Sequence, residues 1–461
     1  METLAPRAQF CIEPECGACF GINECLYTCS QCGGLLEIAK LIDSVDKANN
    51  LPAIWEARRT SFAPRDRSGV WRFRELLPFA EDAPIVTLEE GNTPLFEAPR
   101  CASYCGLDSL TLKHQGCNPT GSFKDTGMTT AVTQALILGA RTVVCASTGN
   151  TAASLAAYAA RAGLQCAILI PQGQVSHAKL AQSLDYGART LEIEGNFDDC
   201  MRLARELAED KSIYLVNSIN PFRIEGQKTV AAELMEQLHW RVPDHVVVPG
   251  GNLGNSSALG KGFSELLDLG LIERLPKLSV IQAESAAPFA RLFTNGDLSG
   301  FATEPIPDDL LEPMTQPQTL ASAIKIGAPV SWKKALRMVV HSGGRVITVT
   351  ENEIADAKAM VGRDGIGCEP ASATTIAGIK RLVAAGYINF SEHVVAVLTG
   401  HVLKDTDYAI AYHDDTLFSP TTEKSRHIAG AYRNPPQRVK SNATDILGTL
   451  NRSASAEKLD E

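Results

Sequence analysis

The sequence has no surplus of positive charge, no long apolar run and no apolar leader at its start. Its 461 residues include 43 Lys and Arg against 53 Asp and Glu, a formal net charge of -10. Because phosphate neutralisation needs clustered cations, this balance argues against a protein that wraps nucleic acid. No apolar run approaches the roughly 20 residues that a membrane-spanning helix requires. The first residues also lack a basic start followed by an apolar core, so we expect a cytoplasmic protein without a nucleic-acid or membrane partner.

Apolar residues make up 44% of the chain and charged residues 21%, which is the composition of an ordinary globular protein. The length predicts two or three domains and allows a large buried core. Thirteen cysteines would suggest disulfides in a small secreted protein. In a long chain of cytoplasmic character, however, we expect the thiols to stay reduced.

Six of the thirteen cysteines lie within the first 32 residues. Two C-x2-C pairs in this head each place two thiolates on one tight turn, and two such pairs facing each other form a tetrahedral zinc site. So short a unit cannot bury enough surface to fold alone, and a metal would supply the missing stability. The pattern predicts a zinc-ribbon-like head over residues 1–40, with a structural Zn²⁺ bound by Cys16, Cys19, Cys29 and Cys32. Cys11 or Cys25 could replace one ligand, and the alternative is a metal-free remnant packed on the next domain.

The main body alternates strand and helix patterns after a polar linker that runs to about residue 82. A β-rich run at 141–146 precedes an Ala-rich helical pattern at 151–161 and a further strand at 166–170. A crossover of this kind implies parallel strands. The order recurs along the chain, with strands expected at 190–193, 213–216, 245–248, 279–283 and 394–398. The fold class we expect is therefore α/β with open parallel sheets.

Lys124 is the first residue that indicates chemistry. It follows a turn containing Pro119 and Gly121, and it lies at the start of the next expected helix. The helix dipole does not favour a cation there; it lowers the lysine pKa, which suits a nucleophilic or Schiff-base amine. Taken alone, an ordinary surface lysine is the alternative.

A glycine-rich loop, Gly250-Gly-Asn-Leu-Gly-Asn255, directly follows the strand expected at 245–248. Glycines let successive backbone N–H groups converge, and the following helix adds its positive end, so the loop could cradle a phosphate. The loop has neither the basic residue of a P-loop nor the G-x-G-x-x-G spacing. We therefore expect a small phosphorylated cofactor rather than a nucleotide. A plain glycine-rich connection is the alternative.

A third segment, Ser147-Thr-Gly-Asn-Thr151, also ends a strand and opens a helix. Its hydroxyl and N–H groups could bind a carboxylate. A helix N-cap would explain one hydroxyl residue but not the whole cluster. A lysine, a phosphate cradle and a carboxylate-binding turn in one α/β chain suggest pyridoxal 5′-phosphate acting on an amino acid.

Five segments and the cysteine-rich head, which ends in CGGLLE (32–37), resemble the threonine synthases over about residues 16–415. The segments are KHQGCNPTGSFKDTGM (113–128), STGNTAASLAAYAARAGL (147–164), NSINPFRIEGQKT (217–229), GIGCEPASATTIAG (365–378) and VLTGHVLKD (397–405). The third and last segments are the specific ones, since the lysine and glycine segments are shared across tryptophan-synthase-β-like enzymes. The resemblance implies two open parallel-sheet αβα lobes of the fold type II pyridoxal-phosphate class. It implies a large domain of residues 41–125 and 226–415 and a smaller mobile lobe of residues 126–225.

The resemblance also implies roles for individual residues. Lys124 would hold the cofactor as a Schiff base and then move protons. The cofactor phosphate would be bound by Gly251, Asn252, Leu253, Gly254 and Asn255. The pyridine ring would contact Asn150 through its hydroxyl and Thr399 through its nitrogen. The substrate carboxylate would be bound by Ser147, Thr148 and Thr151. The candidates for the substrate phosphate are Lys113, Ser218, Asn220 and Arg223.

The reaction that the resemblance implies is the conversion of O-phospho-L-homoserine and water to L-threonine and phosphate, the last step of threonine biosynthesis, by a carbon–oxygen lyase. Alternatives on the same fold are a cysteate synthase acting on phosphoserine and a threonine dehydratase. A non-catalytic, zinc-headed binding protein is an alternative of another class. Fold-level analogy favours a homodimer. The C-terminal extension of residues 416–461 is polar and aperiodic, and we expect its last ~20 residues to be flexible.

Overall fold

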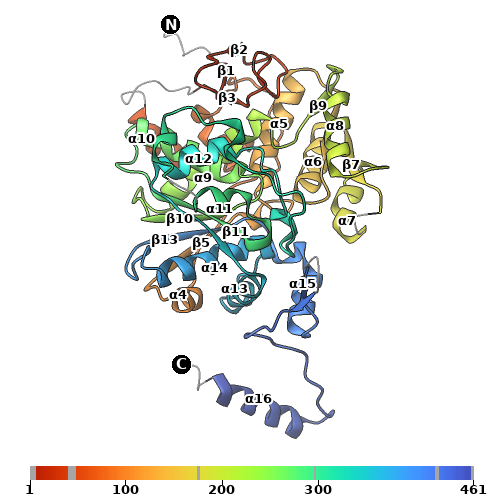
Figure 1. Cartoon of the computed structure of the whole chain (residues 1–461), viewed down its shortest axis with the longest axis vertical. Coiled ribbons are helices and arrows are strands. Elements are labelled where there is room, and N and C mark those ends of the chain that lie inside the picture. Colours follow the sequence, from red (N-terminus) through yellow and green to blue (C-terminus); the bar gives the residue numbers. More distant parts are fainter. Residues whose placement is uncertain (1–6, 40–47, 174–176, 295–296, 421–424, 458–461) are drawn as a thin grey trace.

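Two parallel sheets organise the structure, a computed structural model that describes residues 7–39, 48–173, 177–294, 297–420 and 425–457 (Figure 1). The larger sheet has the strand order β12-β11-β10-β13-β5-β4 and is parallel except at its edge strand β4. Its strands are β4 (Leu95–Glu97), β5 (Leu110–His114), β10 (His245–Pro249), β11 (Lys277–Ala283), β12 (Val346–Val349) and β13 (Val394–Leu398). All residues of β10 and β13 are buried, as expected of central strands covered on both faces.

Helices cover both faces of this larger sheet. Buried side chains of α9, α10 and α12 form one core with β10 and β11, and those of α4, α13 and α14 form another on the opposite face. The helices are α4 (Pro99–Cys105), α9 (Pro221–Gln237), α10 (Gly254–Asp268), α11 (Pro288–Leu292), α12 (Trp332–His341), α13 (Glu351–Arg363) and α14 (Pro370–Ala384). The arrangement is the three-layered αβα architecture that the alternating sequence pattern predicts.

The smaller sheet is entirely parallel, with the order β8-β7-β6-β9. Its strands are β6 (Thr142–Ala146), β7 (Gln165–Pro171), β8 (Arg189–Ile193) and β9 (Ile213–Leu215). Helices α5 and α6 contribute to the core on one side and α8 to the core on the other. The helices are α5 (Lys124–Ile137), α6 (Asn150–Ala162), α7 (His177–Asp185) and α8 (Phe197–Leu207). Helix α6 is followed by Gly163, which caps it in a left-handed conformation with φ 69°.

The cysteine-rich head forms a three-stranded antiparallel sheet with the order β2-β1-β3. Its strands are β1 (Ala8–Cys11), β2 (Cys19–Gly21) and β3 (Leu36–Ile38). In Figure 1 this sheet lies beside the helices of the larger sheet on one side and the smaller sheet on the other. The remaining elements are α2 (Leu51–Arg58), α3 (Pro64–Arg67), α15 (Thr406–His413), α16 (Ala443–Glu457), β14 (Phe418–Ser419) and β15 (Arg426–His427), with 3-10 helices η1 (Trp71–Leu76), η2 (Gln115–Cys117), η3 (Glu284–Ala286), η4 (Ser299–Ala302), η5 (Asp308–Leu310), η6 (Ser322–Ile324) and η7 (Val402–Lys404).

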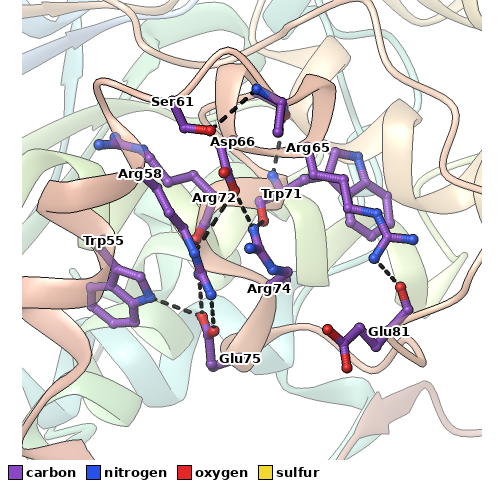
Figure 2. Close-up of polar contacts among 12 residues, drawn as sticks. Trp55, Arg58, Ser61, Arg65, Asp66, Trp71, Arg72, Arg74, Glu75 and Glu81 are labelled. Carbon is purple, nitrogen blue, oxygen red and sulfur yellow. Dashed lines mark hydrogen bonds and ion pairs between the residues drawn. The ribbon is translucent and has the colours of Figure 1, made fainter.

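A network of ion pairs stabilises the segment of α2, α3 and η1, which lies between the head and the larger sheet in the sequence (Figure 2). Arg58 at the end of α2 pairs with Glu75 through two nitrogen–oxygen contacts of 2.5 and 2.8 Å, and Trp55 Nε1 donates to the same carboxylate at 3.0 Å. Asp66 accepts from Arg74 at 2.7 Å. The part of the polar linker that carries these residues is therefore a packed structure held by ion pairs.

The predicted fold class is confirmed, and the expected strands are present within one or two residues. One boundary differs: α10 begins at Gly254 and not after the glycine-rich loop, because the loop turns at Leu253, which has a φ of 63°. Residues 443–457 of the C-terminal extension form α16, which lies apart from the rest of the chain in Figure 1. Within the described ranges, no helix has the length and apolar character needed to span a membrane.

Candidate active site

A large cleft opens where the carboxyl ends of the two parallel sheets face each other. Its lining includes the turn after β6, the glycine-rich loop after β10 and the segment after β13, together with the start of α5. Open α/β sheets bind ligands at such strand ends because loops and helix N-termini converge there. Three segments that are far apart in the sequence thus meet in one cavity.

Lys124 lines this cleft at the first position of α5, as its place after the turn predicts. Burial and the positive charge of Arg223 lower the pKa of its amine to about 7, against a smaller opposing effect of Glu369. The amine lies over the ring of Phe123, 4.0 Å from the centroid. A lysine with such a pKa exists in comparable amounts as amine and ammonium at neutral pH, so it can act as a nucleophile or base and can also return a proton.

The glycine-rich loop after β10 lies in the same cleft, where Gly251, Asn252, Leu253, Gly254 and Asn255 all contribute to the lining. A Cβ at Gly250 would lie 2.6 Å from a methyl carbon of Val280, so the strand end tolerates no side chain there. The side chain of Asn252 accepts a hydrogen bond from the Val330 N–H at 3.3 Å, which holds the loop against the segment that carries Val330. Both side-chain polar atoms of Asn255 are buried without a protein partner. Buried amide groups are rarely left unpaired, so this position suits a polar ligand.

Glu369 is a cleft residue that the sequence analysis did not assign. Its carboxylate accepts hydrogen bonds from Asn150 at 2.9 Å and from the hydroxyl of Thr399 at 3.1 Å. Ser372 donates or accepts a further bond with the Thr399 hydroxyl at 3.0 Å. Burial raises the pKa of Glu369, although these bonds oppose the shift. The available signal was an acidic residue directly before Pro370 at a helix start, inside one of the segments that carries the resemblance.

The serine- and threonine-rich turn after β6 places Ser147, Thr148 and Thr151 in the lining of the cleft. Helix α6 begins at Asn150, so its N-terminal N–H groups lie beside these hydroxyls. Ser147 Oγ accepts a hydrogen bond from the Gly149 N–H at 3.3 Å, which holds the turn. The arrangement suits a carboxylate because free N–H groups and hydroxyls converge at the positive end of the helix.

The four candidates for the substrate phosphate do not all lie together. Ser218 and Arg223 line the cleft. Lys113 does not: it is fully buried and pairs with Glu233, and it also donates to Thr93 O and Gln237 Oε1 at 2.8 Å each. Asn220 caps α9, accepting from the Phe222 N–H at 3.0 Å, and it too lies outside the lining. Both assignments are corrected, since each side chain is committed to holding the fold.

Arg223 retains hydrogen-bonding capacity toward the cleft. One terminal nitrogen donates to Val216 O at 3.3 Å, while Nε is buried without a protein partner. Burial lowers the pKa of this guanidinium to about 10, so it remains charged at neutral pH. A buried cation with an unpaired donor is costly unless an anion arrives, which supports a phosphate as its partner.

Four thiols lie close together in the head, and three of them belong to the four predicted zinc ligands. The sulfur atoms of Cys11, Cys16, Cys29 and Cys32 all lie within 4.8 Å of one another. Cys19 is exposed in β2, where side chains alternate between faces, and its neighbour Ala18 occupies the inner face instead. Cys11 therefore replaces Cys19, a substitution that the sequence analysis left open.

The site described above has the parts of a pyridoxal-phosphate enzyme, and the comparisons agree. The family model of pyridoxal-phosphate dependent enzymes matches residues 86–400. The chain belongs to this family, and within it to the group of the threonine synthases. It is 46% identical to the threonine synthase of Methanocaldococcus jannaschii over 89% of this chain and 96% of that protein.

Further relatives support the same grouping. The threonine synthase of Mycobacterium leprae is 47% identical over 73% of this chain and 89% of that protein. Among solved structures, the diaminopropionate ammonia lyase of Escherichia coli superposes with a TM-score of 0.58 at 15% identity, covering 89% of this chain and 98% of that one. That likeness concerns the fold alone.

The residues of the cleft fit pyridoxal 5′-phosphate. The lowered pKa of the Lys124 amine suits reaction with its aldehyde. The glycine-rich loop and the N-terminus of α10 suit its phosphate, and the unpaired amide of Asn255 lies in that loop. Asn150 and Thr399 both donate hydrogen bonds to the Glu369 carboxylate, Asn150 from the smaller sheet and Thr399 from the larger one. The cleft between the two sheets therefore has a polar side chain on each side that suits the polar groups of the cofactor ring.

Proposed function

We propose that this chain converts O-phospho-L-homoserine and water to L-threonine and phosphate. The observation that carries the proposal is the combination of Lys124 and Arg223 in one cleft of a chain 46% identical to a threonine synthase over 89% of its length. In the overall reaction the Cγ–oxygen bond to phosphate and one Cβ–hydrogen bond break, a proton adds at Cγ, the hydroxyl of water bonds to Cβ, and the other proton of water leaves with phosphate. The enzyme is therefore a carbon–oxygen lyase.

The proposed roles of the chain's residues follow from their positions. When bound, pyridoxal 5′-phosphate supplies the electron sink that stabilises negative charge on the substrate carbons. Ser147, Thr148 and Thr151 orient the substrate by its carboxylate. Lys124 Nζ then removes the proton at Cα and moves protons at the neighbouring carbons, because its pKa of about 7 allows both acceptance and return.

Arg223 is proposed to bind the leaving phosphate, with Ser218 beside it in the cleft lining. The charge of Arg223 stabilises phosphate dianion as the Cγ–oxygen bond breaks, and its planar donors match phosphate oxygens. Because Lys113 and Asn220 lie outside the cleft lining, Arg223 is the cation that we propose for the substrate phosphate. This makes the phosphate site testable with a single variant.

Several finer features remain part of the proposal. A smaller lobe of about residues 126–225 that closes over the substrate is supported by the separate four-stranded sheet. A cytoplasmic location is supported by the thirteen cysteines, all of which are free thiols. A homodimer is supported by analogy with the fold. A structural zinc ion is supported by the four thiols of the head.

The deciding experiment incubates the purified enzyme with O-phospho-L-homoserine and measures phosphate and L-threonine together. We expect equal amounts of the two products. Phosphate without threonine would show that elimination occurs but water addition does not. A parallel reaction with O-phospho-L-serine tests specificity, since one methylene is worth only ~1–3 kcal/mol of discrimination. A higher kcat/KM with O-phospho-L-serine would contradict the proposal.

A further inference from the structure

The four clustered thiols of the head have the geometry of a metal site. Cys11 Sγ lies 3.3 Å from Cys32 Sγ, and Cys16 Sγ lies 3.6 Å from Cys29 Sγ. Four sulfurs at the Zn–S distance of ~2.3 Å in a tetrahedron would be about 3.8 Å apart. The pairs therefore need to separate by only a few tenths of an ångström to take an ion.

The surrounding backbone favours thiolates over thiols. The N–H groups of Glu13, Gln31 and Gly34 donate to the sulfurs of Cys11, Cys29 and Cys32 at 3.4–3.5 Å. A Cβ at Gly34 would lie 3.2–3.3 Å from the Cys11 and Cys32 sulfurs, so the absence of a side chain there keeps the group compact. Donors aimed at sulfur stabilise negative charge, which is the form that binds metal.

One half of this site is fastened to the larger sheet through α12. Arg337 donates to Ile12 O at 2.8 Å, directly after Cys11, and Lys333 pairs with Glu13 at 2.9 Å. Lys334 also donates to Leu36 O at 2.7 Å. Helix α12 packs on α10 and β11 of the six-stranded sheet. The strand that carries Cys11 is thus fixed relative to that sheet.

The other half of the site adjoins the smaller sheet. Tyr27, two residues before Cys29, accepts a hydrogen bond from the Leu215 N–H of β9 at 2.8 Å, and its ring lies 5.7 Å from that of Tyr214. Leu35, three residues after Cys32, packs against the core between β6, β9 and α8. The turn that carries Cys29 and Cys32 is thus in contact with the four-stranded sheet.

We propose that Cys11, Cys16, Cys29 and Cys32 bind one zinc ion, and that this ion makes the head a brace that holds the four-stranded sheet in position against the six-stranded sheet. Four thiolates in tetrahedral array suit zinc, with iron as the other metal that such a site takes. The ion joins the half fastened to α12 to the half in contact with β9. In the described part of the head, the buried cluster beside the thiols comprises Ala18, Cys29 and Leu36, which is a small core, so the ion supplies most of the rigidity of this connection.

The first test measures zinc in the purified holoenzyme after gel filtration. We expect one zinc per chain in the unaltered protein and in Cys19→Ser, which changes an exposed thiol of the same sheet. We expect zinc to be lost in Cys32→Ser. Co²⁺ substitution of the unaltered protein should give the visible bands of tetrahedral tetrathiolate cobalt, a readout that needs no variant. Absence of zinc and of these bands, or equal loss in Cys19→Ser, would overturn the site.

The second test asks whether the ion acts as a brace, using hydrogen exchange with the cofactor still bound. Removing zinc with a chelator should speed exchange of the Leu215 amide by about tenfold, as expected for the loss of one hydrogen bond. Exchange in the central strand β13 should not change. Tyr27→Phe should speed the same amide while zinc is retained. Unchanged exchange at β9, or equal acceleration in β13, would overturn the brace. Neither readout uses turnover, so failure of the proposed function would leave this inference standing.

Discussion

The side-chain amide of Asn150 donates a hydrogen bond to the carboxylate of Glu369 across 2.9 Å. Asn150 begins α6 of the smaller sheet, whereas Glu369 directly precedes α14 of the larger one. The bond therefore crosses the cleft, and it shares its acceptor with Thr399. One buried carboxylate positions both residues that we propose for the cofactor ring.

Glu369→Gln should weaken the binding of pyridoxal 5′-phosphate by about tenfold or more, because a hydrogen bond to a charged group is worth ~1.5–3 kcal/mol. Equilibrium dialysis with the apoprotein measures this. Burial raises the pKa of Glu369, so its charge is lost as the pH falls, at a higher pH than for an exposed glutamate. Cofactor affinity of the unaltered protein should fall over that range, and that of the variant should not. Glu284→Gln, which changes an exposed glutamate at the start of η3, is the control.

Lys124→Ala should remove both turnover and the visible absorbance of lysine-bound cofactor. Because burial and Arg223 lower the pKa of the amine to about 7, its uncharged form predominates above that pH. The rate at which the unaltered apoprotein reacts with cofactor should therefore rise as the pH increases through about 7 and then level off. Lys211→Ala, an exposed lysine, should behave as the unaltered protein. Turnover retained by Lys124→Ala would remove it from the mechanism.

Arg223→Ala should change substrate binding, whereas Lys113→Ala should change the stability of the fold. The first should raise KM for O-phospho-L-homoserine about tenfold or more while cofactor absorbance persists, since it removes a charged donor from the cleft. The second should lower stability by about 3–5 kcal/mol, because it leaves the Glu233 carboxylate buried without its cation. Steady-state kinetics and urea unfolding separate the two. A raised KM for Lys113→Ala at unchanged stability would restore it to the phosphate site.

The ion pairs in Figure 2 predict that the free energy of unfolding decreases in acid. Burial alone would raise the pKa of Glu75, but the hydrogen bonds from Arg58 and Trp55 outweigh it and lower the pKa. A depressed carboxyl pKa stabilises the fold above the unfolded value, near 4.5, and this stability is lost as the pH falls through the folded value. Glu75→Gln should cost about 1 kcal/mol at pH 7 in urea unfolding, and the difference should vanish in strong acid. Glu206→Gln, from an exposed pair with Arg202, should show no such change.

Much of the architecture could be predicted because strands, turns and helix starts depend on residues that are close in the sequence. The apolar runs of β10 and β13 and the turn before Lys124 identify strand ends locally, and parallel connections bring those ends to one edge. The glycine-rich loop and the hydroxyl-rich turn were found for the same reason. These features depend on neighbours a few residues away.

The errors arose where partners are distant in the chain. Lys113 resembles a ligand until its partner Glu233, 120 residues away, is placed beside it. Cys19 matches the spacing of a metal ligand, but the pairing of β1 with β2 turns it outward and brings Cys11 inward. Glu369 becomes a site residue only through contacts with Asn150 and Thr399, which lie in other segments. Tertiary pairing decides these positions.

The strand order of the larger sheet has a consequence for how the protein is made. β13 is the last of its six strands in the chain, yet it lies between β10 and β5, near the centre of the sheet. During synthesis on the ribosome, β5 and β10 emerge first and cannot pair with each other in the native order. Their facing edges stay open until residues 394–398 have left the exit tunnel, and such edges invite aggregation. The nascent chain is therefore most vulnerable over the long interval before its central strand arrives.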